Sequence, residues 1–231
     1  MTITLISGAN KGLGLEAARR LVLLGHTVYL GARDREAGEH AAADVGGTFV
    51  PFDITDDESV AGAVEFIGAR EGVLDVLVNN AGISGGRIPA LETTADDVAR
   101  VFATNVLGIV RVTHAFVPLL DRSDAPVVVN VGSGMGSLTV TTDSSRFEST
   151  LTGLAYPASK AAVSMITSQY AKALPRFRVN VVDPGYTATD LNGHRGTQTV
   201  EEGATAIVAM ASIGPDGPTG TFVDRNGTVP W

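Results

Sequence analysis

Short apolar segments alternate with longer amphipathic segments along the 231 residues of the chain. The apolar segments are rich in Val, Ile and Leu without polar alternation, which is typical of parallel strands covered on both faces. We expect strands at residues 3–7, 27–32, 48–53, 74–80, 126–131, 178–183 and 220–223. Helical periodicity lies between them, at residues 13–24, 35–44, 56–70, 94–120, 157–174 and 201–212.

This alternation predicts an α/β fold built on a doubly wound parallel sheet of the Rossmann type. We expect its crossovers to be right-handed. No internal repeat, linker or low-complexity tract interrupts the pattern. We therefore predict a single domain over residues 1–231.

Composition and charge exclude several classes of function. The formal net charge is −8 without runs of Lys or Arg, which argues against nucleic acid and anionic membranes as partners. The chain has no cysteine, and its four histidines are scattered, so we expect no metal site. We find neither an apolar run near the roughly 18 residues of a membrane helix nor a signal peptide, and expect a cytoplasmic protein.

A glycine-rich turn, SGANKGLG, follows the first strand and opens the first helix. Gly8, Gly12 and Gly14 allow a tight turn and a close approach of the backbone to a pyrophosphate, which a helix N-terminus attracts. The spacing differs from the general G-x-G-x-x-G fingerprint, and a glycine turn without a ligand is the alternative. Its place in the first strand–helix unit favours a dinucleotide site.

The end of the second strand, VYLGARDRE, indicates which dinucleotide binds. An acidic residue there binds the ribose 2′-hydroxyl of NAD, whereas an arginine accommodates the 2′-phosphate of NADP. Arg33 holds this place and Asp34 comes one residue late, while Lys11 in the glycine turn is a second cation expected to converge on the site. We therefore expect NADP(H); the alternative is an ordinary charged turn.

Five motifs occur in a fixed order: SGANKGLG, NNAG at 79–82, Asn105, Ser133, and YPASK with Tyr156 and Lys160. With them the chain resembles the short-chain dehydrogenase/reductase family from Thr2 to its C-terminus. Tyr and Lys four residues apart, with Pro157 in the first helical position, are on their own an ordinary pair on a solvated helix. The ordered set of motifs favours a catalytic pair.

Within this family the chain is most similar to the carbonyl reductase branch, whose members are NADPH-dependent. The similar segments are GANKGLGLEAAR, GARD, LDVLVNNAGI, VEEGA at 200–204 and GPDGPTGTFVDRNGTVPW. Two features depart from that branch. Such enzymes place a second arginine shortly after Arg33, but here Ala37 holds that position and Arg35 is the possible substitute. The connection from Ser133 to Tyr156 is longer than the common form of the family and much shorter than the insertion of the animal carbonyl reductases. Substrate range and oligomeric state therefore do not transfer.

The resemblance implies a catalytic set of Asn105, Ser133, Tyr156 and Lys160. Tyr156 is the expected acid/base, and we expect Lys160 and the helix start to lower its pKa from about 10. The Ser133 hydroxyl is expected to donate to the substrate oxygen, with Ser137 as its rival. Asn105 is expected in a helix break, where its backbone carbonyl holds a water beside the lysine.

The resemblance also assigns cofactor contacts. Asp53 is expected to meet the adenine, Lys160 the nicotinamide ribose, and the segment after the sixth strand the nicotinamide. The residues expected to bind NADP(H) are Gly8, Asn10, Lys11, Gly12, Leu13, Gly14, Arg33, Asp53, Ile54, Asn80, Ala81, Gly82, Tyr156, Lys160, Pro184, Gly185 and Thr187.

These observations predict an NADPH-dependent oxidoreductase that reduces a ketone, aldehyde or quinone carbonyl to the alcohol by reversible hydride transfer, with Tyr156 as acid/base. The expected partner is a small carbonyl or alcohol; a homo-oligomer is left open. One alternative is an NADP-binding regulatory protein, which the complete catalytic set argues against. The other is an NAD-dependent epimerase or dehydratase, which Arg33 and the short chain argue against.

Residues 134–153 form the longest connection without a clear pattern and are rich in Gly, Ser and Thr. Loops of this length in compact domains are usually functional or mobile. We expect a mobile flap on the substrate side. The alternative is a rigid loop that fills space or covers a subunit contact.

Overall fold

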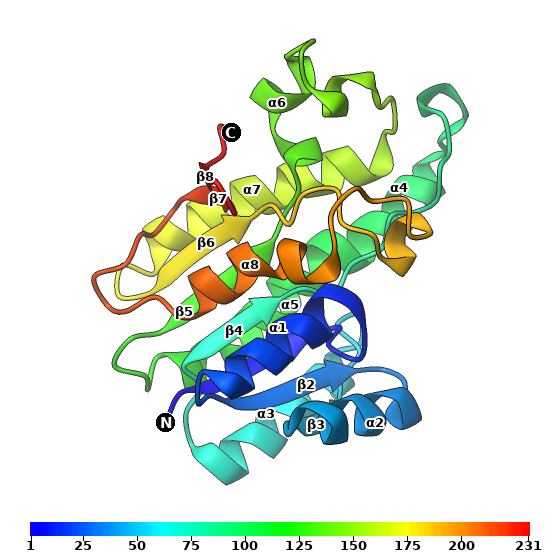
Figure 1. Cartoon of the computed structure of the whole chain (residues 1–231). Helices are drawn as coiled ribbons and strands as arrows, with labels where there is room; N and C mark the ends of the chain where they lie inside the picture. The colour runs from blue at the N-terminus through cyan, green and yellow to red at the C-terminus, as the bar shows by residue number, and fades with distance from the viewer.

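The computed structural model describes residues 1–231 and has one eight-stranded sheet at its centre (Figure 1). The strand order is β3-β2-β1-β4-β5-β6-β7-β8, and only the last pair is antiparallel. The strands are β1 (Ile3–Ser7), β2 (Thr27–Ala32), β3 (Thr48–Pro51), β4 (Val76–Asn79), β5 (Val127–Val131), β6 (Arg178–Val182), β7 (Phe222–Asp224) and β8 (Gly227–Thr228). The predicted doubly wound α/β fold is confirmed, with β8 as an unpredicted addition.

Helices cover both faces of the sheet (Figure 1). The helices are α1 (Gly12–Leu23), α2 (Arg35–Val45), α3 (Asp57–Glu71), α4 (Ala95–Phe102), α5 (Gly108–Leu120), α6 (Leu138–Thr142), α7 (Ala155–Ala173) and α8 (Val200–Ala211). Side chains of α1, α2 and α8 form one apolar core against the sheet, and those of α3 and α5 form the other. Both faces of the central strands are therefore buried, as their unbroken apolar sequences predict.

Two helices differ from their expected course. The helix expected at 94–120 begins with a capping box of Thr94 and Asp97 but contains a π-helical turn at Ala103–Leu107. The helix expected from Pro157 begins at Ala155, so Pro157 occupies its third position and not its first. Proline is still accommodated, because the first N–H groups of a helix have no intrahelical partner.

The continuous helical segment Ala95–Leu120 contains an 18-residue stretch with a mean hydropathy of 1.4, which is long and apolar enough to cross a membrane. The expectation that no apolar run approaches this length is therefore wrong. Half of the stretch is buried inside the protein, and Val112, Phe116 and Leu119 belong to the core beneath the sheet. Its apolar character is explained by this packing.

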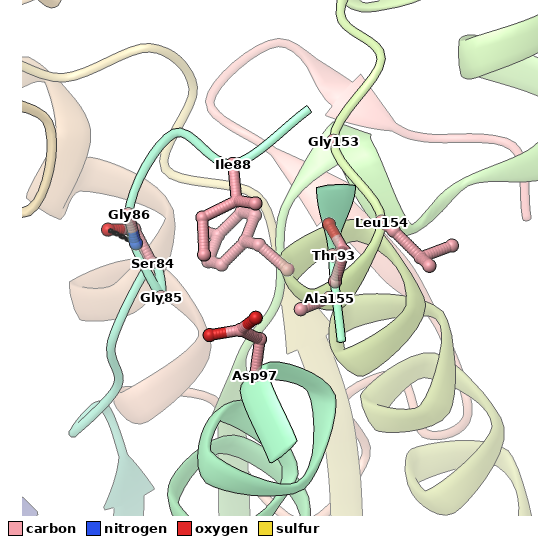
Figure 2. A pocket seen from close by; sticks show the side chains of 10 residues that line it. Ser84, Gly85, Gly86, Ile88, Thr93, Asp97, Gly153, Leu154 and Ala155 are labelled. Carbon is pink, nitrogen blue, oxygen red and sulfur yellow. Dashed lines mark hydrogen bonds between the residues drawn. The ribbon is translucent and has the colours of Figure 1, made fainter. Parts of the chain in front are cut away.

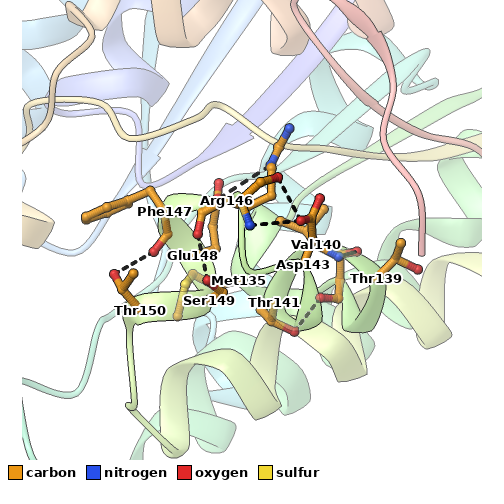
Figure 3. Close-up of polar contacts among 12 residues, drawn as sticks. Met135, Thr139, Val140, Thr141, Asp143, Arg146, Phe147, Glu148, Ser149 and Thr150 are labelled. Atoms are coloured by element: carbon orange, nitrogen blue, oxygen red, sulfur yellow. Dashed lines mark hydrogen bonds and ion pairs between the residues drawn. The ribbon is translucent and has the colours of Figure 1, made fainter.

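The connection at 134–153 has more structure than its sequence predicts. It contains a 3₁₀ turn at Gly134–Gly136, helix α6 and a second 3₁₀ turn at Phe147–Thr150. Ser137 Oγ donates to the Pro230 carbonyl at 2.6 Å, and the Thr139 hydroxyl donates to the Trp231 carbonyl at 2.7 Å. The second half is held mainly by bonds between near neighbours (Figure 3).

Candidate active site

Most of the sequence-predicted site residues lie in the loops after β1, β2, β3, β4, β5 and β6 or in the first turn of α1, whereas Asn105 lies in the π-helical turn and Tyr156 and Lys160 lie near the start of α7. These loops follow the carboxyl ends of parallel strands and therefore share one edge of the sheet. The strand order reverses between β1 and β4. In open α/β sheets, ligands bind at the carboxyl edge beside such a reversal.

The glycine turn between β1 and α1 requires glycine at Gly8, Gly12 and Gly14. Gly8 and Gly12 have φ angles of 64° and 57°, which side chains rarely adopt. A Cβ on Gly14 would lie 2.5 Å from both Asn80 Nδ2 and the Gly8 carbonyl oxygen. The first turn of α1 has neither a side-chain cap nor an acidic residue, so its N–H groups can bind an anion such as a pyrophosphate.

Two further predicted residues belong to this turn but differ in their surroundings. Asn10 is half-buried within it. Leu13 packs into the core between α1 and α8. The structure gives Leu13 a packing role in addition to its place beside the expected phosphates.

The end of β2 presents a single cation to the site. Arg33 is exposed, whereas Asp34 caps α2 by accepting the Ala37 N–H at 3.0 Å. Lys11 donates instead to Asp190 Oδ2 at 2.7 Å. Lys11 is therefore paired with Asp190 in this structure, and its convergence with Arg33 on a ligand stays a prediction. The Asp34 carboxylate is occupied by its capping bond.

Asp53 and Ile54 follow β3. Asp53 Oδ1 accepts the Thr55 N–H at 2.9 Å and the Thr55 hydroxyl at 2.7 Å. Burial opposes ionisation, but these bonds and the charges of Arg33 and Arg111 hold the pKa of Asp53 below its usual value. Ile54 is buried and its carbonyl accepts a hydrogen bond from Arg111 at 3.0 Å.

The segment after β4 connects the two halves of the site. Asn80 Nδ2 donates to the Ser7 and Gly8 carbonyls at 2.9 and 3.0 Å, so its side chain holds the glycine turn in place. A Cβ on Gly8 would lie 3.0 Å from the Ala81 Cα. A Cβ on Gly82 would lie 3.8 Å from Lys160 Nζ. The segment after β4 therefore borders both the glycine turn and the catalytic lysine.

Asn105 lies in the π-helical turn and is 1% exposed. Its Oδ1 accepts the Ile83 N–H at 2.9 Å, and its Nδ2 donates to the Ile83 carbonyl at 2.9 Å and to Ser159 Oγ at 3.0 Å. The expected break in the helix is a π-helical turn, a known marker of functional sites. Its side chain ties the loop after β4 to α7.

We expect Asn105→Ala to destabilise the protein by about 1–3 kcal/mol, because it leaves buried partners at Ile83 without a hydrogen bond. Chemical denaturation would measure the change, and the exposed Asn226→Ala is the matched control. A stability of Asn105→Ala equal to that of the control would show that these bonds contribute little.

Tyr156, Lys160 and Ser133 come together at the carboxyl end of β5. Lys160 Nζ donates to the Val131 carbonyl at 2.7 Å and lies 5.6 Å from the centroid of the Tyr156 ring. Ser133 Oγ accepts the Met135 N–H at 3.2 Å. The rival Ser137 is buried and bonded to the C-terminal segment, so the structure favours Ser133.

The electrostatics of the pair differ from expectation. Burial raises the pKa of Tyr156 to about 12, although the Ser133 hydroxyl acts in the opposite direction. Burial also lowers the pKa of Lys160 to about 8. The expected lowering of the Tyr156 pKa is therefore wrong in this structure, because desolvation outweighs the lowering by the Ser133 hydroxyl.

The segment after β6 contributes a residue that the sequence did not indicate. Gly185 has a φ of 71°, and a Cβ there would lie 2.7 Å from Gln198 Oε1. That oxygen is buried without a hydrogen-bond partner. Thr187 donates to the Pro184 carbonyl at 2.9 Å. The free amide oxygen beside Gly185 suits a cofactor carboxamide, and only the fold brings Gln198 there.

A small cavity of about 30 Å³ opens beside Tyr156 (Figure 2). Its walls come from Ser84, Gly85, Gly86, Ile88, Thr93, Asp97, Gly153, Leu154, Ala155 and Tyr156. This volume holds little more than a water molecule or two. The cavity by itself is too small for a carbonyl compound.

This edge of the sheet has the features of a dinucleotide-dependent oxidoreductase site. A family model described as short chain dehydrogenase matches residues 2–199. The chain therefore belongs to the short-chain dehydrogenase family. It is an oxidoreductase of that family, whose members bind a nicotinamide cofactor.

Three known proteins illustrate the similarity. The (+)-neomenthol dehydrogenase of Capsicum annuum is 30% identical, over 95% of this chain and 94% of that protein. The NADPH-bound carbonyl reductase from chicken fatty liver superposes with a TM-score of 0.87 over all of both chains, at 24% identity. The 3-ketoacyl-(acyl-carrier-protein) reductase of Brucella melitensis, complexed with NADH, gives a TM-score of 0.84 at 25% identity, over 97% of this chain and 96% of that one.

Proposed function

We propose that the protein is an NADPH-dependent reductase that converts a ketone, aldehyde or quinone carbonyl to the alcohol. The observation that carries this proposal is the meeting of Ser133, Tyr156 and Lys160 at the end of β5, next to the glycine turn. The similarity to a neomenthol dehydrogenase supports a small carbonyl or alcohol as the substrate.

The residues of the site have complementary roles in the proposed reaction. The nicotinamide cofactor, when bound, supplies the hydride. Tyr156 donates the proton from its hydroxyl to the substrate oxygen, and its raised pKa keeps that proton in place at neutral pH. The Ser133 hydroxyl donates a hydrogen bond to the same oxygen as charge develops on it.

The proposed preference for NADPH depends on Arg33. It is the cation at the end of β2, while Asp34 is occupied by the cap of α2. A guanidinium binds phosphate through charge-assisted, often bidentate hydrogen bonds. Lys11 would have to exchange Asp190 for the same phosphate in order to contribute.

A screen of ketones, aldehydes and quinones for NADPH consumption tests the proposed activity. We expect turnover with members of at least one of these classes and formation of the corresponding alcohol. NADPH binding without turnover of any carbonyl would instead favour a regulatory protein.

We further propose that the mobile part of the connection is residues 143–152, because Ser137 and Thr139, at the start of α6, are bonded to the C-terminal segment. Phe147 packs on Tyr186 of the loop after β6 with ring centroids 5.5 Å apart. These two loops can therefore close over a substrate together.

Trypsin is expected to cut the free protein early after Arg146, and NADPH with a carbonyl ligand is expected to protect that bond. Arg146→Gln, which removes the cleavage point, is the control. Early cutting elsewhere while residues 143–152 resist throughout would contradict a mobile flap and support a rigid loop.

A further inference from the structure

An ion pair joins the glycine turn to the loop between β6 and α8. Lys11, the residue before α1, donates to Asp190 Oδ2 at 2.7 Å, and both side chains are more than half exposed. The two residues are 179 positions apart in the chain. The fold therefore places a carboxylate on a lysine of the turn where the cofactor phosphates are expected.

A short turn holds Asp190 beside the glycine turn. The His194 N–H donates to the Thr189 carbonyl at 2.9 Å across it. A Cβ on Gly12 would lie 3.7 Å from the Thr189 methyl carbon, so the two turns lie next to each other. The carboxylate is held in place by this backbone, whereas Lys11 reaches it with a long, flexible side chain.

Asp190 has a second partner besides Lys11. His194 Nε2 lies 2.8 Å from Asp190 Oδ1, so each carboxylate oxygen has a contact of its own. The hydrogen bonds from Lys11 and His194 hold the pKa of Asp190 below its usual value. Asp190 therefore carries its charge at neutral pH, and it keeps a partner when Lys11 moves away.

A phosphate monoester is a stronger partner for an ammonium group than a carboxylate is. It carries about −1.5 to −2 charge at pH 7 and three acceptor oxygens. The 2′-phosphate that distinguishes NADPH from NADH is such a group. When it approaches Lys11, Asp190 must either release the lysine or share it with a second anion. Asp190 opposes binding of the phosphate in both cases.

We propose that Asp190 is a specificity-determining residue, which occupies Lys11 in the cofactor-free protein and thereby limits the preference for NADPH over NADH. This inference rests on the proposed binding of NADPH at Arg33 and the glycine turn. Arg33 belongs to none of the ion pairs of the protein, so it has no such competitor. NADH, which lacks the 2′-phosphate, leaves the Lys11–Asp190 pair intact.

Fluorescence titrations with NADPH and NADH measure the effect on binding without any carbonyl substrate. Asp190→Asn retains the size of the side chain and removes its charge. At low salt it should bind NADPH roughly two- to fivefold more tightly, as expected for release of an exposed ion pair, with NADH affinity unchanged. The gain should shrink at about 1 M salt, where the Debye length is about 3 Å.

Asp44→Asn is the matched control. Asp44 pairs with Arg19 at the same distance of 2.7 Å and is 52% exposed, against 54% for Asp190. It lies near the end of α2, away from the glycine turn. Its replacement removes the same charge from the protein and should leave both affinities unchanged.

A double-mutant cycle with Lys11→Met tests whether Asp190 acts through the lysine. Lys11→Met alone should weaken NADPH binding. Adding Asp190→Asn to it should give no gain, because the carboxylate then has no lysine to occupy. The full gain of Asp190→Asn in the Lys11→Met background would contradict a role through Lys11.

NMR with ¹³C-labelled lysine follows the exchange in the unmodified protein. The chain has only three lysines, Lys11, Lys160 and Lys172, and Lys11→Arg identifies the Lys11 signal. NADPH should move this signal, whereas NADH should leave it in place. In the cofactor-free protein, Asp190→Asn should also move it, because the carboxylate beside the ammonium is gone.

Unchanged or weaker NADPH binding in Asp190→Asn would overturn the proposal, and so would an equal gain for NADH or for Asp44→Asn. If Asp190→Asn does not fold, the unmodified protein decides, since a Lys11 signal that does not respond to NADPH is also contradictory. Failure to reduce any carbonyl would contradict the proposed function and leave these binding results standing.

Discussion

Replacing Tyr156 with Phe is expected to remove carbonyl reduction and to leave NADPH binding nearly intact. The substitution deletes only the hydroxyl proposed to donate the proton, while the glycine turn, Arg33 and Lys160 should keep their places. A general acid contributes roughly 10²- to 10⁴-fold to a rate, so kcat at saturating NADPH should fall by that factor. Steady-state kinetics and a fluorescence titration of NADPH measure the two effects separately.

Tyr170→Phe is the matched control, because Tyr170 lies on the same helix, is half-buried and packs against the core away from the site. It should retain normal kcat. Near-normal kcat in Tyr156→Phe would show that another group donates the proton. An equal loss of NADPH affinity and kcat would instead indicate a structural role for the hydroxyl.

Replacing Arg33 with Ala is expected to reduce the proposed preference for NADPH over NADH. A charge-assisted hydrogen bond contributes about 1.5–3 kcal/mol, which corresponds to roughly 10- to 100-fold in the ratio of the two kcat/KM values. The loss should appear with NADPH, because NADH has no 2′-phosphate for Arg33 to bind.

Arg35→Ala tests whether Arg35 takes the place of the second arginine of the carbonyl reductase branch. Arg35 is bonded to Glu39 at 3.1 Å and lies over the Phe49 ring, so its removal should change the preference much less. Equal KM values for NADPH and NADH in the unmodified protein would falsify the assignment of the phosphate site to Arg33.

The fold could be predicted because its signals are local. Each central strand is an apolar run buried on both faces, and each helix carries its own periodicity, so the order of elements follows from the chain. The ends of the strands are harder to predict, because apolar residues continue beyond the last residue that is hydrogen-bonded to the neighbouring strand. Phe52 and Ile54, for example, follow β3 and are still buried.

The arrangement of the predicted site residues depends on contacts between distant segments. The sequence offered Lys11 and Arg33 as converging cations, but Asp190, far along the chain, holds Lys11. The sequence also favoured a lowered pKa for Tyr156. It shows that Lys160 is four residues away, but it does not show that the Tyr156 hydroxyl is buried. Burial reverses that expectation.

The position of Gln198 could not be predicted for the same reason. Gln198 belongs to no motif, and it lies beside Gly185 because the loop before α8 places it there. Asn105 is an intermediate case. An amide inside an apolar helical pattern indicated a special position, but only the structure shows that it bonds to Ile83 and Ser159.

Transfer of deuterium from NADPH labelled at the reactive C4 position tests the central claim most directly. The unmodified protein, given a carbonyl compound from the screen, should place the label on the former carbonyl carbon of the alcohol, and Tyr156→Phe should form that labelled product far more slowly. NADPH consumption that leaves the carbonyl carbon unlabelled would contradict carbonyl reduction by this site.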